Sequence, residues 1–105
     1  GPFPEATGEA GLEADAWLMV AQALGSPSLG GLEAAKESVA EARAIFARLE
    51  DRSGEVRAME LLTQIYLRHD LPAEAVDVGK SIVSYLHQAQ DREGEAKALL
   101  PGPQR

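Results

Sequence analysis

The two histidines, His69 and His87, are the side chains best suited to metal binding or proton transfer at neutral pH. They lie far apart in the sequence, neither lies in a His-x-x-x-His pattern, and the sequence contains no cysteine. Zinc sites need several ligands held together, and covalent catalysis needs a nucleophile beside a base. The spacing therefore predicts a structural role for both histidines, with no metal site, no cofactor and no enzyme activity.

The segment 25–31, Gly-Ser-Pro-Ser-Leu-Gly-Gly, is the second candidate for chemistry. It is rich in glycine and precedes a helical pattern, where backbone N–H groups bind anions. However, it lacks the Gly-Lys-Ser/Thr ending of a phosphate loop, and it follows a helical pattern rather than a strand. We therefore interpret it as a turn and not as a nucleotide site.

The balance of charge excludes other functions. The 105 residues include 10 Lys and Arg and 17 Asp and Glu, giving a net charge of −7. A nucleic-acid binder presents a basic face, so no nucleic-acid partner is expected. No apolar run reaches the length of a membrane span, and no signal-peptide pattern is present. The absence of cysteine fits a reducing compartment and predicts a cytoplasmic, intracellular protein.

Four stretches have the spacing of amphipathic helices, at residues 12–24, 32–49, 54–69 and 72–89. Nothing alternates with the period of a strand, so the sequence predicts an all-α protein. The connections are short, and we expect sequential helices to pack antiparallel. Residues 1–11 and 101–105, rich in Gly and Pro, are predicted to be tails, the first disordered because Pro2 and Pro4 break helices.

In the first stretch, the predicted core stripe has steps of three and four residues, with a flank of larger apolar residues. The stripe is Leu12, Ala16, Met19 and Ala23, flanked by Trp17, Val20 and Leu24. Trp17, the only tryptophan, is expected to pack between the first two helices, with a partner-facing anchor as the alternative.

An internal repeat organises the helices. Residues 51–58, Asp-Arg-Ser-Gly-Glu-Val-Arg-Ala, recur at 91–98 as Asp-Arg-Glu-Gly-Glu-Ala-Lys-Ala. Ala35 aligns with Ala75 in this same register, which we call the short register. Ala16 aligns with Ala58 in a slightly longer one, the long register. A helical hairpin repeated at a period of about 40 residues is typical of an α-solenoid.

The repeat also assigns a role to its aspartates. Asp51 and Asp91 open the two copies of the repeated segment. A carboxylate at the start of a helix accepts hydrogen bonds from the first backbone N–H groups. We therefore expect both aspartates to begin helices.

The stretch 62–76 resembles a tetratricopeptide (TPR) repeat, in which Leu62, Thr63, Tyr66 and Ala75 occupy the characteristic positions. The linker at 51–58 and 91–98 is similar to that of the longer, roughly 40-residue TPR variety. The resemblance covers residues 12–100: hairpin 12–49, hairpin 54–89 and a partial third helix pair at 92–100. It implies stacked antiparallel hairpins, and HEAT-like helical pairs are the nearest alternative.

The resemblance also implies a protein-interaction scaffold that binds a peptide along the first helix of each hairpin. The residues carried over to that face are Arg57, Gln64, Arg68, Lys97, Leu18 and Gln22. Its cations would favour an acidic peptide through charge-assisted hydrogen bonds, while a merely solvated helix face is the alternative. The sequence contains no asparagine, so the TPR clamp that holds a C-terminal carboxylate with paired Asn side chains is not expected.

A second functional hypothesis is self-association. The apolar flank of the fourth helix and the pair Leu99 and Leu100 could join two copies into a homodimer, through exposed solenoid ends or by helix exchange.

Overall fold

The described part of the chain consists of four α-helices and one short 3₁₀ segment. The computed structural model describes the backbone of residues 4–99 and the side chains of residues 8–95. The elements are α1 (Pro4–Leu24), η1 (Pro27–Leu29), α2 (Leu32–Arg48), α3 (Arg52–Arg68) and α4 (Pro72–Leu99). No strand is present between residues 4 and 99, so the all-α prediction is confirmed.

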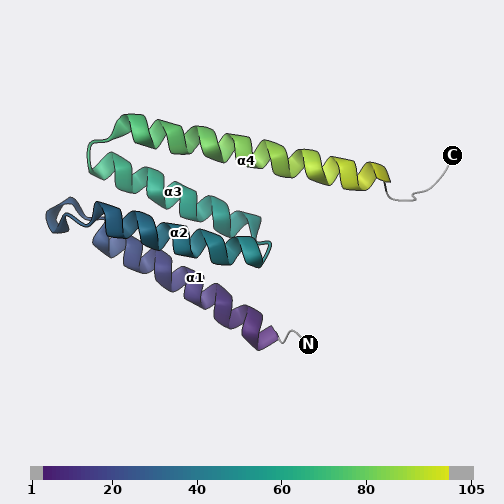
Figure 1. The fold of residues 1–105 in the computed structure, drawn as a ribbon, viewed down its shortest axis with the longest axis horizontal. Coiled ribbons are helices and arrows are strands. Elements are labelled where there is room, and N and C mark those ends of the chain that lie inside the picture. The colour runs from purple at the N-terminus through teal and green to yellow at the C-terminus, as the bar shows by residue number, and fades with distance from the viewer. Residues whose placement is uncertain (1–3, 100–105) are drawn as a thin grey trace.

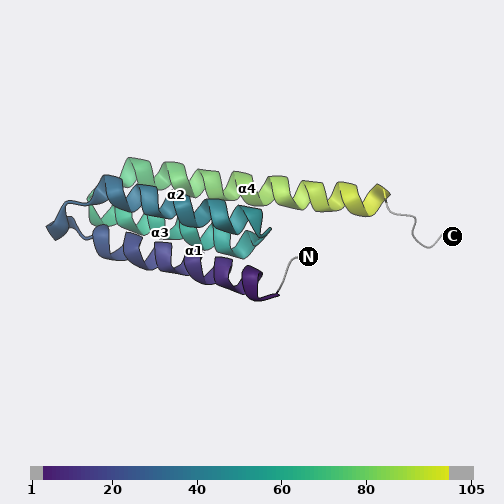
Figure 2. The same ribbon diagram turned by 60° about the horizontal axis from the view of Figure 1, so that its bottom comes forward.

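The helices lie side by side in an antiparallel row (Figures 1 and 2). Each helix packs on the next, and α1 also contacts α3. The row measures 62 × 36 × 13 Å, with a radius of gyration of 16.8 Å. A compact domain of this length has a radius of gyration of about 13 Å. The chain is therefore an elongated array of helical hairpins rather than a globule.

Two matching short turns set the spacing of α2, α3 and α4, which begin at residues 32, 52 and 72. In each turn one residue takes the left-handed conformation, Glu50 with φ 56° and Asp70 with φ 59°. The N–H of Asp51 bonds back to the carbonyl of Phe46 at 2.9 Å, and the N–H of Leu71 makes the same bond in the next turn. This closure satisfies carbonyl groups that a helix end leaves without a partner.

Asp51 begins α3 as the sequence predicts. Its carboxylate Oδ1 accepts a hydrogen bond from the N–H of Gly54 at 2.9 Å. Asp91 does not repeat this role, because it lies inside α4, which continues without a break to Leu99. The sequence predicts a third helix pair at residues 92–100. This prediction is wrong for residues 92–99, which continue α4.

The continuation of α4 has a physical reason. A turn there would place Gln90 in the left-handed conformation, which costs a non-glycine residue about 1–2 kcal/mol. At the two earlier turns this cost is offset, because the helix that follows packs against its neighbours. Continuing the helix through residues 92–99 avoids that cost and keeps the backbone hydrogen bonds of α4.

The repeated aspartates provide a matched pair of substitutions. Asp51→Ala is expected to lower the free energy of unfolding by about 1 kcal/mol, because the N–H of Gly54 loses its acceptor. Asp91→Ala, at an exposed position within α4, is expected to change it by no more than about 0.5 kcal/mol. Urea unfolding followed by circular dichroism measures both. Equal losses for the two variants would contradict the assignment.

The start of α1 also differs from the prediction. The helix begins at Pro4, within the segment 1–11 that the sequence predicts to be a disordered tail. Proline is well tolerated in the first turn of a helix, where its missing N–H would have no intrahelical partner. Pro4 therefore begins the helix instead of breaking it.

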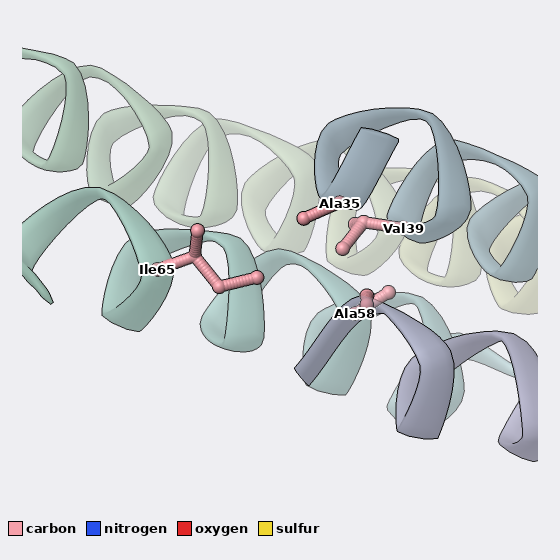
Figure 3. Close-up of a cluster of buried hydrophobic side chains, with 5 residues drawn as sticks. Ala35, Val39, Ala58 and Ile65 are labelled. Carbon is pink, nitrogen blue, oxygen red and sulfur yellow. The ribbon is translucent and has the colours of Figure 1, made fainter. Parts of the chain in front are cut away.

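Two clusters of small and medium side chains form the core. In the first, Ala35 and Val39 of α2 lie against Ala58 and Ile65 of α3, with Ala21 of α1 (Figure 3). In the second, Ala14 of α1 joins Ala42, Ile45 and Phe46 of α2, with Trp17 packed against them. Alanine at these positions lets neighbouring helices approach closely. The predicted packing of Trp17 between the first two helices is confirmed.

The buried face of α1 is not the predicted one. Leu12 and Met19 are 70% and 69% exposed, and Ala16 and Ala23 are not buried either. Another face is buried instead and includes Ala14 and Ala21. Both stripes have steps of three and four residues, so periodicity does not separate them. The stripe with buried alanines packs inward because it allows the closer approach to α2 and α3.

Candidate peptide-binding hollow between α1 and α3

A hollow of about 410 Å³ lies between α1 and α3. Four residues from each helix line it: Asp15, Leu18, Met19 and Gln22 from α1, and Arg57, Glu60, Leu61 and Gln64 from α3. Each α1 residue aligns with one of the α3 residues, in the same order, in the long register that pairs Ala16 with Ala58. The hollow therefore lies between equivalent faces of two repeated helices.

An ion pair crosses one end of the hollow. Arg57 Nη1 lies 3.5 Å from Asp15 Oδ1, and Asp15 Oδ1 is itself buried. The Arg57 guanidinium also stands over the Phe46 ring, with its carbon 5.3 Å from the ring centroid. Cation–π and ionic contacts together hold Arg57 in place. Both side chains remain about half exposed, so the pair orients the arginine more than it stabilises the fold.

The structure brings together four of the six residues predicted to bind a partner: Leu18, Gln22, Arg57 and Gln64. Arg68 is exposed in the last turn of α3, outside the lining of the hollow. Lys97 belongs to the end of α4, whose side chains lie outside the described residues.

Sequence reasoning missed Met19 and Leu61 as a pair that lines the hollow. The long register was the signal that could have found them, because it aligns Met19 with Leu61. The same register also aligns Gln64 with Gln22, and both glutamines are among the predicted partner-binding residues.

The charges of the hollow differ from the predicted basic strip. Its lining contains two carboxylates, Asp15 and Glu60, and one cation, Arg57. Because Asp15 already neutralises Arg57, no unpaired cation faces an incoming ligand among the lining residues. The geometry therefore does not support the expected preference for an acidic peptide.

A second polar cluster joins three helices around Glu55, whose side chain is only 12% exposed. Tyr85 Oη of α4 donates a hydrogen bond to Glu55 Oε2 at 2.6 Å, and Arg43 Nε of α2 donates to Oε1 at 3.4 Å. Nearby, Arg52 pairs with Glu93 across α3 and α4. Both carboxylate oxygens of Glu55 are engaged, so the cluster acts as a polar connection between helices.

The Tyr85 phenol provides a pH test of this connection. Burial raises its pKa above the ordinary value of 10.0, and the bond to Glu55 adds to the effect. The folded state thus holds the proton more tightly than the unfolded chain. The resulting stabilisation is complete below about pH 10 and is lost as the pH rises through the raised pKa. Urea unfolding at about pH 9 and 11 should show a smaller alkaline loss for Tyr85→Phe than for the unmodified chain. Equal losses would contradict the role of Tyr85.

His69 makes a structural contact within the described part of the chain. Its Nε2 donates a hydrogen bond to the carbonyl of Gly25 at 2.8 Å, which ties the end of α3 to the turn after α1. Among the described residues, no group of three or more His, Cys, Asp or Glu side chains is placed to hold a metal. Likewise, none of the helices in the described range is long and apolar enough to cross a membrane.

Comparison of the chain with protein-family models, with curated proteins and with solved structures found no match. The TPR resemblance therefore stays a prediction that depends on the residues quoted for it. The hollow between α1 and α3 is the feature on which a functional proposal can be built.

Proposed function

We propose that the chain is a non-catalytic protein-interaction module of the TPR-like α-solenoid type. It binds a peptide or protein segment in the hollow between α1 and α3. The observation that carries this proposal is that residues at equivalent positions of two repeated helices line the hollow. An intracellular location, expected from the absence of cysteine, is part of the same proposal.

The lining combines the two kinds of contact that a peptide needs. Leu18, Met19 and Leu61 offer apolar surface for a side chain of the ligand. Gln22 and Gln64 each carry an amide that donates and accepts, so they can satisfy backbone N–H and C=O groups of an extended segment. The hollow has the volume of a small binding site. We therefore expect a short segment with an apolar anchor.

The charge of the ligand follows from the lining. Asp15 and Glu60 outnumber Arg57, and the whole chain carries a net charge of −7. Long-range repulsion slows the approach of acidic segments. We therefore propose a neutral or weakly basic segment in place of the acidic peptide expected from sequence.

A displayed library of random short peptides, selected against the whole chain, tests the proposal. For the selected peptides, Gln22→Ala and Gln64→Ala are each expected to weaken binding about 2–10-fold, the equivalent of one hydrogen bond. Gln88→Ala removes the same side chain from an exposed site on α4 and is the matched control.

Amide chemical shifts measured with the bound peptide locate the contact independently. They are expected to change around Leu18, Gln22 and Gln64. Failure to select any peptide, or binding that both glutamine substitutions leave intact, would overturn the proposal. A selected set dominated by Asp and Glu would restore the acidic ligand expected from sequence.

A further inference from the structure

Two apolar stripes are exposed on opposite edges of the helical row. The α1 stripe consists of Leu12, Ala16, Met19 and Ala23, whose large members are 70% and 69% exposed. The α4 stripe consists of Val76, Val83 and Leu86, which are 55%, 58% and 42% exposed. Because α1 and α4 are the outer helices of the described row (Figure 1), each stripe lies on a helix at one edge of the array.

The α1 stripe is equivalent to a face that is buried elsewhere in the molecule. In the long register its members align with Gly54, Ala58, Leu61 and Ile65 of α3. Three of these, all but the partly buried Leu61, are buried, and this face packs on α2 in the first core cluster and against Phe46. The α1 stripe thus has the residue spacing of a helix face that receives α2.

The α4 stripe is equivalent to the opposite half of the same contact. In the short register, which aligns Ala35 with Ala75, its members Val76, Val83 and Leu86 align with Lys36, Arg43 and Phe46 of α2. Lys36 stands over the Tyr66 ring of α3, Arg43 bonds to Glu55 of α3, and Phe46 is buried against Gly54 of α3. The α4 stripe therefore occupies the positions that contact α3 in the equivalent helix α2.

We propose that copies of this chain stack head to tail, with α4 of one copy packed on α1 of the next in the same arrangement as α2 on α3. The occupant is a second copy because both halves of the contact are present on one chain. The exchange of side-chain sizes supports this arrangement. Phe46 opposite Gly54 corresponds to Leu86 opposite Leu12, so a large–small pair is replaced by two side chains of medium size.

A polar pair is also available in the same arrangement. Ala47 of α2 and Glu55 of α3 line one hollow. Their counterparts are His87 of α4, in the short register, and Glu13 of α1, in the long register. Stacking therefore brings an imidazole of one copy toward a carboxylate of the next. The stacking also covers Val76 and Val83, which occupy the positions where α2 has Lys36 and Arg43.

The geometry determines the kind of assembly. Different surfaces meet in this contact, so it does not close on itself as a twofold dimer does, and further copies can add. One helix pair is a small interface, and each copy carries a net charge of −7. The association is therefore weak, and added salt strengthens it by screening the repulsion.

Sedimentation velocity of the whole chain from about 10 μM to about 1 mM tests the proposal, a range that covers weak association. The weight-average mass is expected to rise above 11.2 kDa with concentration, and to rise further with added salt. A mass that stays at the monomer value throughout this range overturns the proposal.

Two charge substitutions distinguish head-to-tail stacking from a symmetric dimer. Leu12→Glu blocks the α1 stripe and Val83→Glu blocks the α4 stripe, and each alone is expected to raise the dissociation constant at least tenfold. A mixture of the two variants retains one intact stripe of each kind, so it is expected to form dimers and nothing larger. Association of one variant alone, as symmetric pairing through α1 or α4 predicts, overturns the proposal.

The controls add the same charge elsewhere on the surface. Ser84→Glu lies beside Val83 in sequence and Ala44→Glu lies on α2; both positions are exposed and outside the two stripes. Both controls are expected to associate as the unmodified chain does. Leu12 and Val83 do not line the hollow between α1 and α3, so neither substitution removes a side chain of the proposed peptide site, although Met19 belongs both to that site and to the α1 stripe.

Discussion

Phe46→Ala is expected to lower the free energy of unfolding by about 3–5 kcal/mol. Phe46 is 1% exposed, and it is one of the two largest side chains that are fully buried among the described residues. Its ring packs with Ala14, Ala42 and Ile45 and against Gly54, so its removal leaves a cavity where α1, α2 and α3 meet. Domains of this size are stable by only about 5–15 kcal/mol. Urea unfolding followed by far-UV circular dichroism measures the loss.

Two controls separate the cavity from the loss of apolar character. Phe46→Leu keeps most of the buried volume and is expected to cost less than about 1.5 kcal/mol. Val83→Ala removes apolar atoms from a 58% exposed side chain and is expected to change the stability by no more than about 0.5 kcal/mol. A loss below about 1 kcal/mol for Phe46→Ala would falsify this account of the core.

The helices and most turns could be predicted because local signals agree there with the packing. Asp51 caps α3, and Pro72 begins α4. Ala35 and Ala75 are buried at 0% and 4% exposure, as their alignment in the repeat predicts. Short polar turns between amphipathic stretches leave little choice except antiparallel neighbours.

The face of α1 could not be predicted from periodicity. Leu12 and Met19 form one regular stripe, and Ala14 and Ala21 lie on another. Hydrophobicity favours the first stripe because its side chains are larger. Packing selects the second, since buried alanines allow three helices to approach closely. The choice depends on the partner helices, which a single stretch of sequence does not contain.

The length of α4 could not be predicted from local sequence. The segment beginning at Asp91 closely repeats the one beginning at Asp51, yet only Asp51 caps a helix. A turn forms when the helix that follows buries enough surface to offset its cost. Closely similar local sequence therefore gave a wrong prediction at Asp91, because the packing that stabilises the earlier turn has no counterpart in the described residues.

The candidate site could be predicted in part for a related reason. Leu18, Gln22, Arg57 and Gln64 line one hollow because the repeat places equivalent faces of α1 and α3 together. The pairing of Arg57 with Asp15 was missed. It depends on the lateral distance between two helices, and that distance is set by the alanines of the core.

Gly54→Ala is expected to lower the free energy of unfolding by about 1–3 kcal/mol, against the usual effect of this substitution in a helix. Alanine normally stabilises a helix relative to glycine by about 1 kcal/mol. At Gly54, however, an added Cβ overlaps the Phe46 ring and lies 2.7 Å from its Cε1 atom. The ring is rigid and buried, so either the ring or α3 must move. Close approach of α2 and α3 is therefore the reason for glycine at this position.

Gly79→Ala is the matched control, because a Cβ at Gly79 of α4 meets no atom within 4 Å. It is expected to stabilise the chain by about 0.5–1 kcal/mol. The double variant Gly54→Ala with Phe46→Ala then tests the mechanism, since alanine at position 46 removes all the ring atoms that the new methyl group overlaps. Its loss should be smaller than the two single losses combined, by at least about 0.5 kcal/mol. Additive losses would mean that the cost of Gly54→Ala arises from the backbone of α3 and not from its contact with α2.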